Sequence, residues 1–413
     1  MAIAHADPLS AARDAIDCIR PSTHVVAGAL AAQPRYLLRA LADKAQETRG
    51  IALSTGMLTD GYDYLADGRM RYRTWFPPGT LTTARPRPGA VEYLPMSWSQ
   101  LVEWLAGPAK VDVVLVQVAP ADPDGNHSLG VSSSYLLPAI EAASVVIGEV
   151  NQRMPRTCGA KVQTSVFTST IDVDYQLPSF PARQPGELDV QIARQIVAML
   201  PAAPCIQVGV GAIPDAVVRA LARADRRDIK LHSVLTNSVI ELSAADGLSD
   251  GDDAMVVGEI LGDQELYDFV DGNERVRLVG GRETHSLSAL ASLRNFCAIN
   301  SALSVDLFGQ INSEYIGGRH LGALGGLADF ARGGLLPGNL SVTALRSTTA
   351  DGSSRIVPVL DTPTVTLSRD MTQIVVTEHG VADLRGKSVT ERARALAGIA
   401  DPRFRDDLSR VAP

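Results

Sequence analysis

Cysteine is scarce in this sequence, and the four that occur are far apart along the chain. They are Cys18, Cys158, Cys205 and Cys297. They form no CxxC pair and no spacing typical of metal ligands. We therefore expect no resident metal and no disulfide framework, and a reduced cytoplasmic protein is the simplest interpretation.

Long hydrophobic runs are also missing. The apolar stretches have the length of strands and fall short of the roughly 18 residues that a membrane span requires. The first residues show no basic segment followed by an apolar run, as a secretory signal would. We expect neither export nor a membrane partner.

Positive charge is the weaker of the two signs. The sequence has 38 basic and 46 acidic residues and a formal net charge of -8. The main basic cluster, Arg223 with Arg226 and Arg227, is short and interrupted by Asp225 and Asp228. A nucleic-acid binder normally presents a basic stripe, so nucleic acid is excluded as an expected partner.

The length of 413 residues, with 46% hydrophobic and 20% charged residues, is typical of a globular enzyme with more than one core. A proline-containing segment of low periodicity at 172–188 reads as a linker. We predict an N-terminal domain over 1–180 and a C-terminal domain over 189–413.

Short apolar runs alternate with segments of helical period in both halves. Strands are predicted within 23–30, 50–58, 111–120 and 144–150, with helices over 34–46 and 134–143 between them. After a predicted helix at 189–200 the pattern restarts at 205–224. Continuous apolar strands separated by helices predict an α/β fold with mainly parallel sheets covered by helices.

Two glycine-rich segments stand out. Gly209-Val210-Gly211 follows an apolar strand and opens a predicted helix, where backbone amides can hold an anion or a developing oxyanion. A purely structural turn is the alternative. The second segment, 317–330, places small residues where a ligand or another backbone comes close, and its alternative is a flexible surface loop.

Four blocks of sequence, 120–135, 208–217, 300–333 and 375–404, together resemble the acetyl-CoA hydrolase/transferase family. The resemblance implies two CoA-transferase-type α/β domains, an active site in the cleft between them, and a homodimer or larger homo-oligomer. It also implies that coenzyme A is a substrate or product and not a permanently bound cofactor.

Members of this family carry a catalytic glutamate in a His-Ser-Glu context, and it forms an acyl-glutamyl anhydride and then a glutamyl-CoA thioester. The matching segment here begins His232-Ser233 and continues with Val234. Valine has no lone pair, so the carboxylate mechanism cannot run through this position. Moving Glu241 into the site would shift the strand by seven residues and lose the His-Ser match.

Other groups are candidates to replace the missing carboxylate. Glu259 lies in an apolar strand, where a carboxylate is either functional or paired. Glu314 precedes the second glycine segment and is either a general base or structural. A serine nucleophile at Ser233 is disfavoured because strand alternation turns it away from the direction of Val234. We interpret the Glu378-His379 pair as structural.

The resemblance also implies where the thioester would bind. We expect an oxyanion hole around Val210 and the Gly325-Gly326 pair. The residues expected to hold CoA or its phosphates are Gly209, Gly211, Gly322, Arg319 and Lys387, with Arg385 as a further cation. Each of these cations is alternatively an ordinary surface charge.

Three hypotheses follow. The favoured one is direct acyl transfer from an acyl thioester to a non-carboxylate acceptor or water, without a glutamyl-CoA intermediate, in a specialised biosynthetic role. The second is a CoA-transferase between carboxylic acids that uses Glu259 or Glu314. The third is a non-catalytic CoA-binding homologue or partner subunit.

Overall fold

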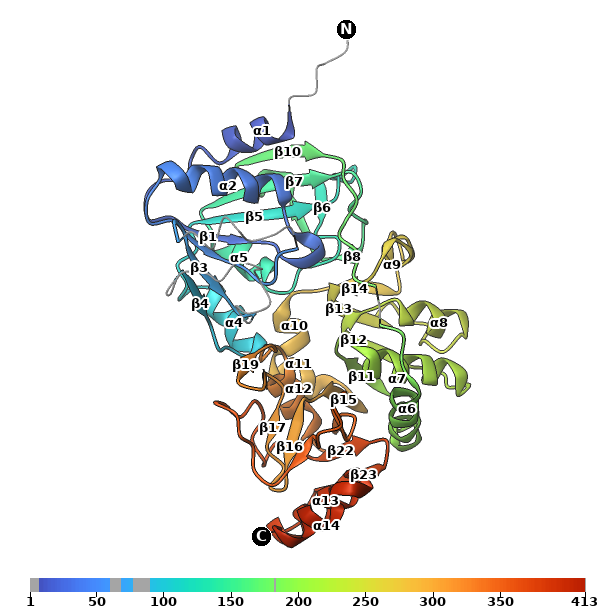
Figure 1. Cartoon of the computed structure of the whole chain (residues 1–413). Coiled ribbons are helices and arrows are strands. Elements are labelled where there is room, and N and C mark those ends of the chain that lie inside the picture. Colours follow the sequence, from blue (N-terminus) through green and yellow to red (C-terminus); the bar gives the residue numbers. More distant parts are fainter. Residues whose placement is uncertain (1–6, 60–67, 77–89, 182, 413) are drawn as a thin grey trace. The chain divides into compact units, whose positions relative to one another are not determined.

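The structure, a computed structural model, describes residues 7–59, 68–76, 90–181 and 183–412, and it divides into two compact units (Figure 1). Unit 1 comprises Met1–Phe180 and Val257–Glu283, and unit 2 comprises Pro181–Val256 and Thr284–Pro413. Segment 257–283, which the sequence division placed in the C-terminal domain, therefore belongs to unit 1. The two units interleave along the chain.

Unit 1 is built on a seven-stranded sheet in which neighbouring strands run parallel. Strand β5 (Val113–Val118), next to the central strand, is buried at each of its six residues, so helices must cover both of its faces. In spatial order the strands are β10 (Ser169–Val173), β7 (Val145–Asn151), β5 (Val113–Val118), β1 (His24–Ala27), β2 (Ala52–Ser54), β3 (Arg71–Thr74) and β4 (Val91–Tyr93).

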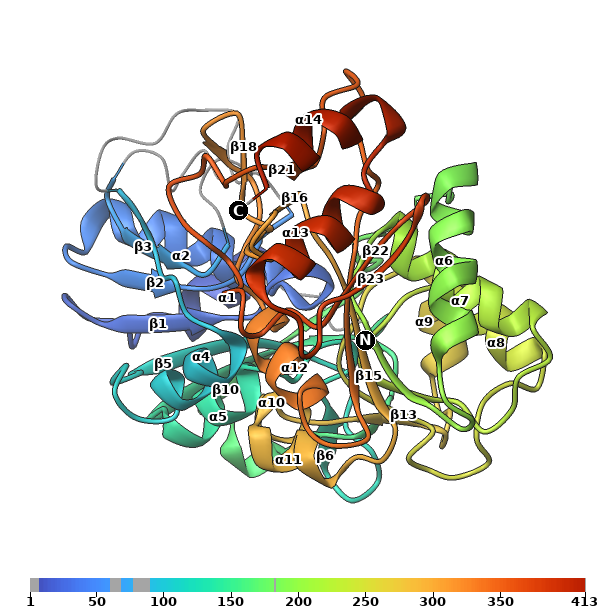
Figure 2. The same ribbon diagram turned by 90° about the horizontal axis from the view of Figure 1, so that it is seen from below.

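Helices α1 (Pro8–Ala15) and α2 (Arg35–Glu47) cover one face of this sheet, and α4 (Trp98–Leu105) and α5 (Leu136–Ala142) lie on the other (Figures 1 and 2). The buried face of α2, with Leu37 and Leu41, packs against Val25 and Leu115 of the sheet. Outside these layers unit 1 contains η1 (Leu30–Ala32), β6 (Asn126–Ser128), β8 (Cys158–Gly159), β9 (Lys161–Gln163), η3 (Thr164–Val166), α9 (Gln264–Val270) and β14 (Val276–Leu278). Two elements span a division between the units, β13 (Met255–Ile260) and α10 (Gly281–His285).

Unit 2 has its own largely parallel sheet, with an antiparallel hairpin at one edge. At its centre, Ile206 lies opposite Leu231 on one side and Cys297 on the other. The strands in spatial order are β23 (Gly380–Asp383), β22 (Ile374–Thr377), β20 (Leu340–Ala344), β15 (Phe296–Ser301), β11 (Cys205–Val208) and β12 (Lys230–Leu235).

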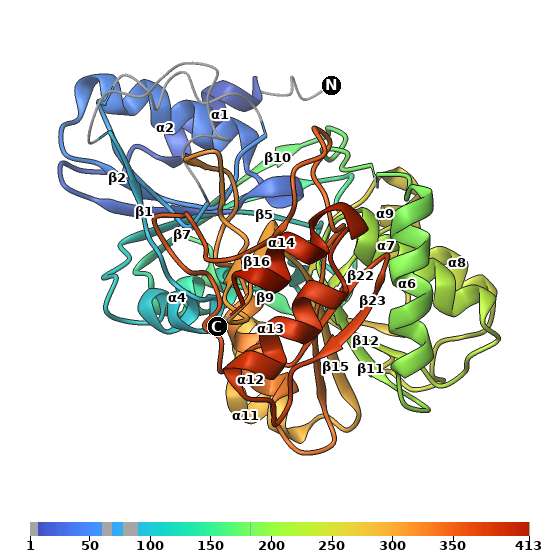
Figure 3. The same cartoon turned by 60° about the horizontal axis from the view of Figure 1, so that its bottom comes forward.

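Helices pack around the sheet of unit 2, and Figure 3 shows α6 (Glu187–Met199) and α7 (Ala212–Arg223) side by side. The other helices are α8 (Ser238–Ala244), α11 (Leu287–Ser292), α12 (Leu327–Gly334), α13 (Val389–Gly398), η4 (Pro402–Phe404) and α14 (Arg405–Arg410). Short strands complete the unit: β16 (Ser304–Asp306), β17 (Ile311–Asn312), β18 (Tyr315–Ile316), β19 (Arg319–His320) and β21 (Ile356–Val357).

The predicted α/β class with mainly parallel, helix-covered sheets is confirmed. Boundaries differ by a few residues. The segment predicted as a linker from 172 begins inside β10, and the helix predicted from 189 begins at Glu187, where the Asp189 side chain accepts from the amide of Gly186. No helix in the described ranges is long and apolar enough to cross a membrane.

A buried carboxyl group stabilises the start of α2. The N-cap residue Pro34 offers no side-chain acceptor, and Glu149 of β7 supplies one by accepting from the amides of Tyr36 and Leu37, each at 3.0 Å. The Tyr175 hydroxyl donates to the other oxygen. Desolvation outweighs these bonds and raises the pKa of Glu149 to about 7. Helix and sheet are thus joined by a polar contact inside the core.

Glu149→Ala should lower the free energy of unfolding by about 2 to 4 kcal/mol, because two amides and a hydroxyl lose their acceptor in a buried site. Glu149→Gln keeps one carbonyl oxygen to accept from the amides, so its free energy of unfolding should fall by less than half of the decrease expected for Glu149→Ala. Chemical denaturation of both variants measures this. Equal losses in the two variants would show that acceptance by the side chain is not what stabilises α2.

Candidate functional site

The strand ends that carry the predicted site lie next to each other in unit 2. Strands β11 and β12 are parallel neighbours, and their last registered pair is Gln207 with His232. Gly209 and Val234 each follow that pair by two residues. Because parallel strands end at the same edge of a sheet, the Gly209-Val210-Gly211 turn and the Val234 position meet at one edge.

The turn after β11 opens directly into α7. Its N-cap is Gly211, with φ of 145°, a backbone conformation that favours glycine. Val210 is 60% exposed, and no atom would contact a Cβ added at Gly209. Pro214 has no amide N–H, so the first helical turn presents the amides of Ala212 and Ile213, which precede the bond from Asp215 to the Gly211 carbonyl and lie at the positive end of the helix dipole. The turn can therefore receive a negatively charged oxygen.

Strand β12 is strained at its end. Ser233 is buried and has φ of +85°, an unusual value for a residue with a side chain. Val234 follows it and is half-buried. Strain of this kind persists only where the surroundings enforce it, and here it sets the direction of the chain at the position that the family resemblance assigns to the nucleophile.

A buried carboxyl group holds the loop after β12 against α7. Asp215 accepts from the hydroxyls of Thr236 at 2.7 Å and Ser238 at 3.1 Å. Burial raises the pKa of Asp215, although both hydroxyls oppose this shift. The contact fixes Val234 relative to the helix that begins at the Val210 turn.

Sequence reasoning missed a polar pair beneath this edge. Gln207 of β11 is buried, and its amide exchanges hydrogen bonds with that of Asn300 on β15, at 3.0 and 3.3 Å. The signal was a single glutamine inside the apolar run CIQVGVG. A buried amide with a reciprocal partner positions the two strand ends and adds polar atoms below the turn.

A chain of buried contacts links β12 to the second glycine segment. His232 donates from Nε2 to the carbonyl of Thr284 at 2.9 Å, and the Thr284 hydroxyl lies 2.7 Å from Nδ1 of His285. Burial lowers the pKa of both histidines, so neither carries charge at neutral pH. His285 in turn packs against Phe330 and Gly326. The neutral His232 ring is therefore held in place through the Thr284 carbonyl.

Packing accounts for the glycine at two positions of the second segment. A Cβ on Gly322 would lie 2.0 Å from the carbonyl oxygen of Ser313, and one on Gly326 would lie 2.7 Å from Nε2 of His285. Gly325, with φ of +51°, faces open space. It precedes the first turn of α12, so the Gly325-Gly326 pair again presents backbone at a helix N-terminus.

The candidate carboxylates of unit 2 are engaged in structural contacts. Glu241 forms an ion pair with Arg219 at 2.7 Å. Glu314 is buried, accepts from the Thr366 hydroxyl at 2.9 Å and lies 3.6 Å from His320. Glu378 accepts from the amide and hydroxyl of Ser347, at 2.9 and 2.6 Å.

Glu259 lies in unit 1, on β13. It is partly buried, and the Ser132 hydroxyl donates to it at 3.0 Å. Desolvation raises the pKa of Glu259 to about 8, against the opposing effect of the Ser132 hydrogen bond. The group is therefore largely protonated at neutral pH, and a protonated carboxyl is a weak nucleophile.

The candidate phosphate-binding cations come from separate elements. Arg319 is exposed in the β18–β19 hairpin, and Lys387 is exposed in the turn before α13. Arg385 forms a bidentate pair with Asp383 at 2.9 and 2.7 Å. Within the described part of the chain, no group of three or more His, Cys, Asp and Glu side chains could hold a metal ion.

Comparison with known proteins identifies the family. The model of the acetyl-CoA hydrolase/transferase N-terminal domain matches residues 5–175, and that of the C-terminal domain matches residues 262–412. The chain belongs to the acetyl-CoA hydrolase/transferase family. The family resemblance drawn from the four sequence blocks is confirmed.

Relatives cover nearly the whole chain. The 4-hydroxybutyrate coenzyme A transferase of Clostridium kluyveri is 32% identical over 97% of this chain and 96% of its own length. The butyryl-CoA:acetate CoA-transferase of Anaerostipes caccae is 30% identical over 98% and 95%. The crystal structure of RipA from Yersinia pestis is 28% identical, with a TM-score of 0.87 over 97% and 96% of the two chains.

Family membership confirms the prediction that this protein is an enzyme of acyl-CoA chemistry, a transferase or a hydrolase. The roles of the site residues, the location of the active site between the domains and the homo-oligomer stay predictions.

Gly326→Ala should lower the free energy of unfolding by about 1 to 3 kcal/mol, because the added methyl overlaps His285 and Phe330. The matched control is Gly209→Ala, where nothing lies within 4 Å of the added atom. Denaturation curves compare the two. A larger loss for the control would contradict the packing role of Gly326.

Glu259→Gln should change how stability depends on pH. The folded pKa of about 8 lies above the ordinary 4.5, so the folded state binds the extra proton, and the contribution of Glu259 to stability falls as pH rises from about 4.5 to about 8. The slope is at most about 1.4 kcal/mol per pH unit. The variant's stability relative to wild type should therefore rise across that window.

Urea unfolding at a series of pH values measures this difference. Glu265→Gln, an exposed position on α9, removes the same charge as a control. Parallel pH profiles for wild type and Glu259→Gln would refute the assignment of a protonated carboxyl.

Proposed function

We propose that this protein transfers the acyl group of an acyl-CoA directly to an acceptor, which is water or a non-carboxylate nucleophile. The observation that carries the proposal is the valine at position 234, at the end of β12 beside the Val210 turn. An apolar side chain there cannot form the anhydride through which a carboxylate nucleophile works. Relatives named as CoA-transferases and as acetyl-CoA hydrolases support acyl-CoA as the substrate.

In the proposed reaction the acceptor attacks the thioester carbonyl carbon, and the carbonyl oxygen becomes an oxyanion. The carbon–sulfur bond then breaks, and the acceptor's proton ends on the departing thiol, giving the acylated acceptor and free CoA. Backbone amides at the N-termini of α7 and α12 are suited to stabilise the oxyanion. Positioning of the two reactants supplies the rest of the rate enhancement.

The state of the other carboxylates supports this assignment. Glu241 and Glu314 are held by Arg219 and Thr366, and a largely protonated Glu259 is poorly suited to attack a thioester. Val234 also lines the site with apolar surface, which favours an acyl group larger than acetyl. A specialised biosynthetic reaction fits such a substrate.

A second candidate rests on Glu259 itself. It is a carboxyl group in an otherwise apolar strand, and a fraction of it ionises near pH 8. If it served as the nucleophile, the protein would be a CoA-transferase between carboxylic acids, with a covalent CoA thioester on Glu259.

Intact-protein mass spectrometry distinguishes the two. The protein is incubated with a panel of acyl-CoAs in three conditions: with water as the sole acceptor, with an added amine, and with an added carboxylate. We expect release of free CoA and no mass gain corresponding to bound CoA. Glu259→Gln should retain at least half of the CoA release.

A CoA adduct on Glu259 that the Glu259→Gln variant lacks would replace the proposal with the CoA-transferase mechanism. Acyl-CoA binding without CoA release under any acceptor condition would replace it with a non-catalytic CoA-binding role.

A further inference from the structure

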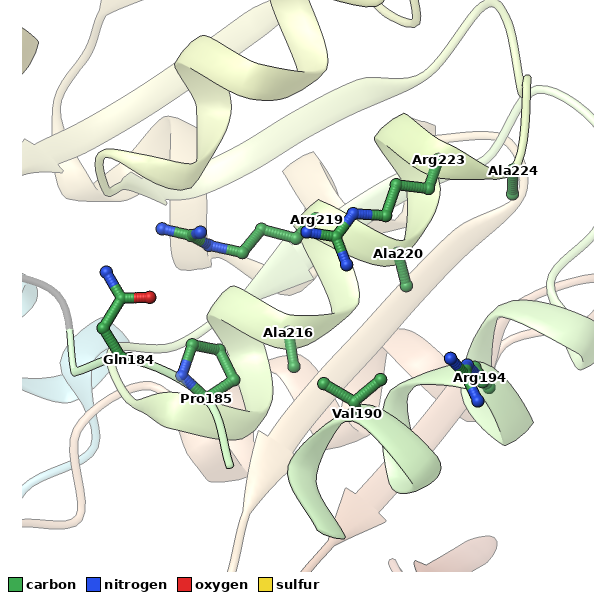
Figure 4. A pocket seen from close by; sticks show the side chains of 9 residues that line it. All are labelled: Gln184, Pro185, Val190, Arg194, Ala216, Arg219, Ala220, Arg223 and Ala224. Atoms are coloured by element: carbon green, nitrogen blue, oxygen red, sulfur yellow. The ribbon is translucent and has the colours of Figure 1, made fainter. Parts of the chain in front are cut away.

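A pocket of about 370 Å³ lies between α6 and α7, entirely within unit 2. Its floor is apolar and is formed by Val190 of α6 and Ala216 and Ala220 of α7. Figure 4 shows the arginine side chains around this floor, two extending from α7 and one from α6. The volume is within the usual range for small-molecule sites.

The polar lining of this pocket carries charge of one sign. Arg194, Arg219 and Arg223 line it, and none of its nine lining residues is acidic. Arg219 and Arg223 are four residues apart on one helix, and like charges at that spacing repel each other. In a chain with a formal net charge of -8, such a cluster is a local reversal of sign.

The chain itself neutralises only part of this charge. Arg219 pairs through Nη1 with Glu241 at 2.7 Å, while its Nε is buried without a hydrogen-bond partner among the described residues. Arg194 and Arg223 form no ion pair with any described residue. Arg227, from the same basic run in the sequence, is instead paired with Asp225 and Asp246.

Three arginine side chains that line a pocket with an apolar floor are suited to a phosphate attached to an organic group. Arginine presents planar donors that match phosphate oxygens, and the floor offers contact area for the rest of the molecule. We propose that the α6–α7 pocket binds a phosphate group of a phosphorylated small molecule.

The site does not depend on the proposed acyl-transfer mechanism, although it lies on the helix that begins at the Val210 turn. Ala216 is four residues beyond the first residue of α7, about 6 Å along the helix axis. A ligand here would stabilise the same helix whose N-terminus is assigned to the oxyanion. The phosphate group that binds in this pocket belongs either to CoA or to a separate phosphorylated compound.

Titration calorimetry at low salt tests the proposal, with inorganic pyrophosphate as the probe and the double variant Arg194→Ala/Arg223→Ala. Arg219 is left in place because Glu241 would otherwise lose its partner. We expect the double variant to weaken pyrophosphate binding at least tenfold, and Arg227→Ala to weaken it less than twofold. Added salt should weaken wild-type binding.

CoA titrated into the same proteins identifies the source. Weaker CoA binding in the double variant assigns the pocket to a phosphate of CoA, and unchanged CoA binding with lost pyrophosphate binding assigns it to a separate phosphorylated ligand. Both outcomes support a phosphate site. No pyrophosphate binding by wild type, equal binding by the double variant, or tighter binding of an acidic peptide that the double variant abolishes would overturn it.

Discussion

Hydrogen bonding among β15, β11 and β12 in one parallel ladder is the interaction on which the arrangement of unit 2 depends. Parallel strands can be connected only by crossovers, so the turns after these strands gather at a common edge. The Val210 turn, the Val234 position and Asn300 reach that edge from segments almost a hundred residues apart. An α/β sheet places its functional loops in this way, and the ladder decides which loops meet.

Buried polar contacts then fix the positions of the loops and helices that the hydrogen bonds between strands do not fix. Asp215 holds the loop after β12 to α7, and the Thr284 and His285 pair connects His232 to the helix that follows Gly326. Burial lowers the pKa of both histidines, so they hold these elements together without adding charge to the interior. Ser233, buried and with φ of +85°, lies next to His232 in this network, and such strain persists only where the surroundings enforce it.

The backbone and side chains at the carboxyl ends of these strands limit the chemistry that unit 2 can support. The N-termini of α7 and α12 present backbone amides, and β12 carries Val234 one residue before its end. Electrostatic stabilisation can persist when a nucleophile is absent, because it resides in the backbone and does not depend on one side chain. In the α6–α7 pocket three arginine side chains line the surface, and the ion pairs of the described residues give them one acidic partner, Glu241. One helix, α7, thus carries two features suited to negative charge.

The sequence by itself determined the α/β class and the family, because strand periodicity and long local matches are properties of contiguous residues. It did not determine that 257–283 belongs to unit 1, nor that Gly322 and Gly326 are required by Ser313 and His285. The Gln207–Asn300 hydrogen bonds and the arginine-lined pocket between α6 and α7 could not be predicted from the sequence either. Only the tertiary structure decided these, because each depends on contacts between residues distant in sequence, and a side chain's burial and partners set both its pKa and its role.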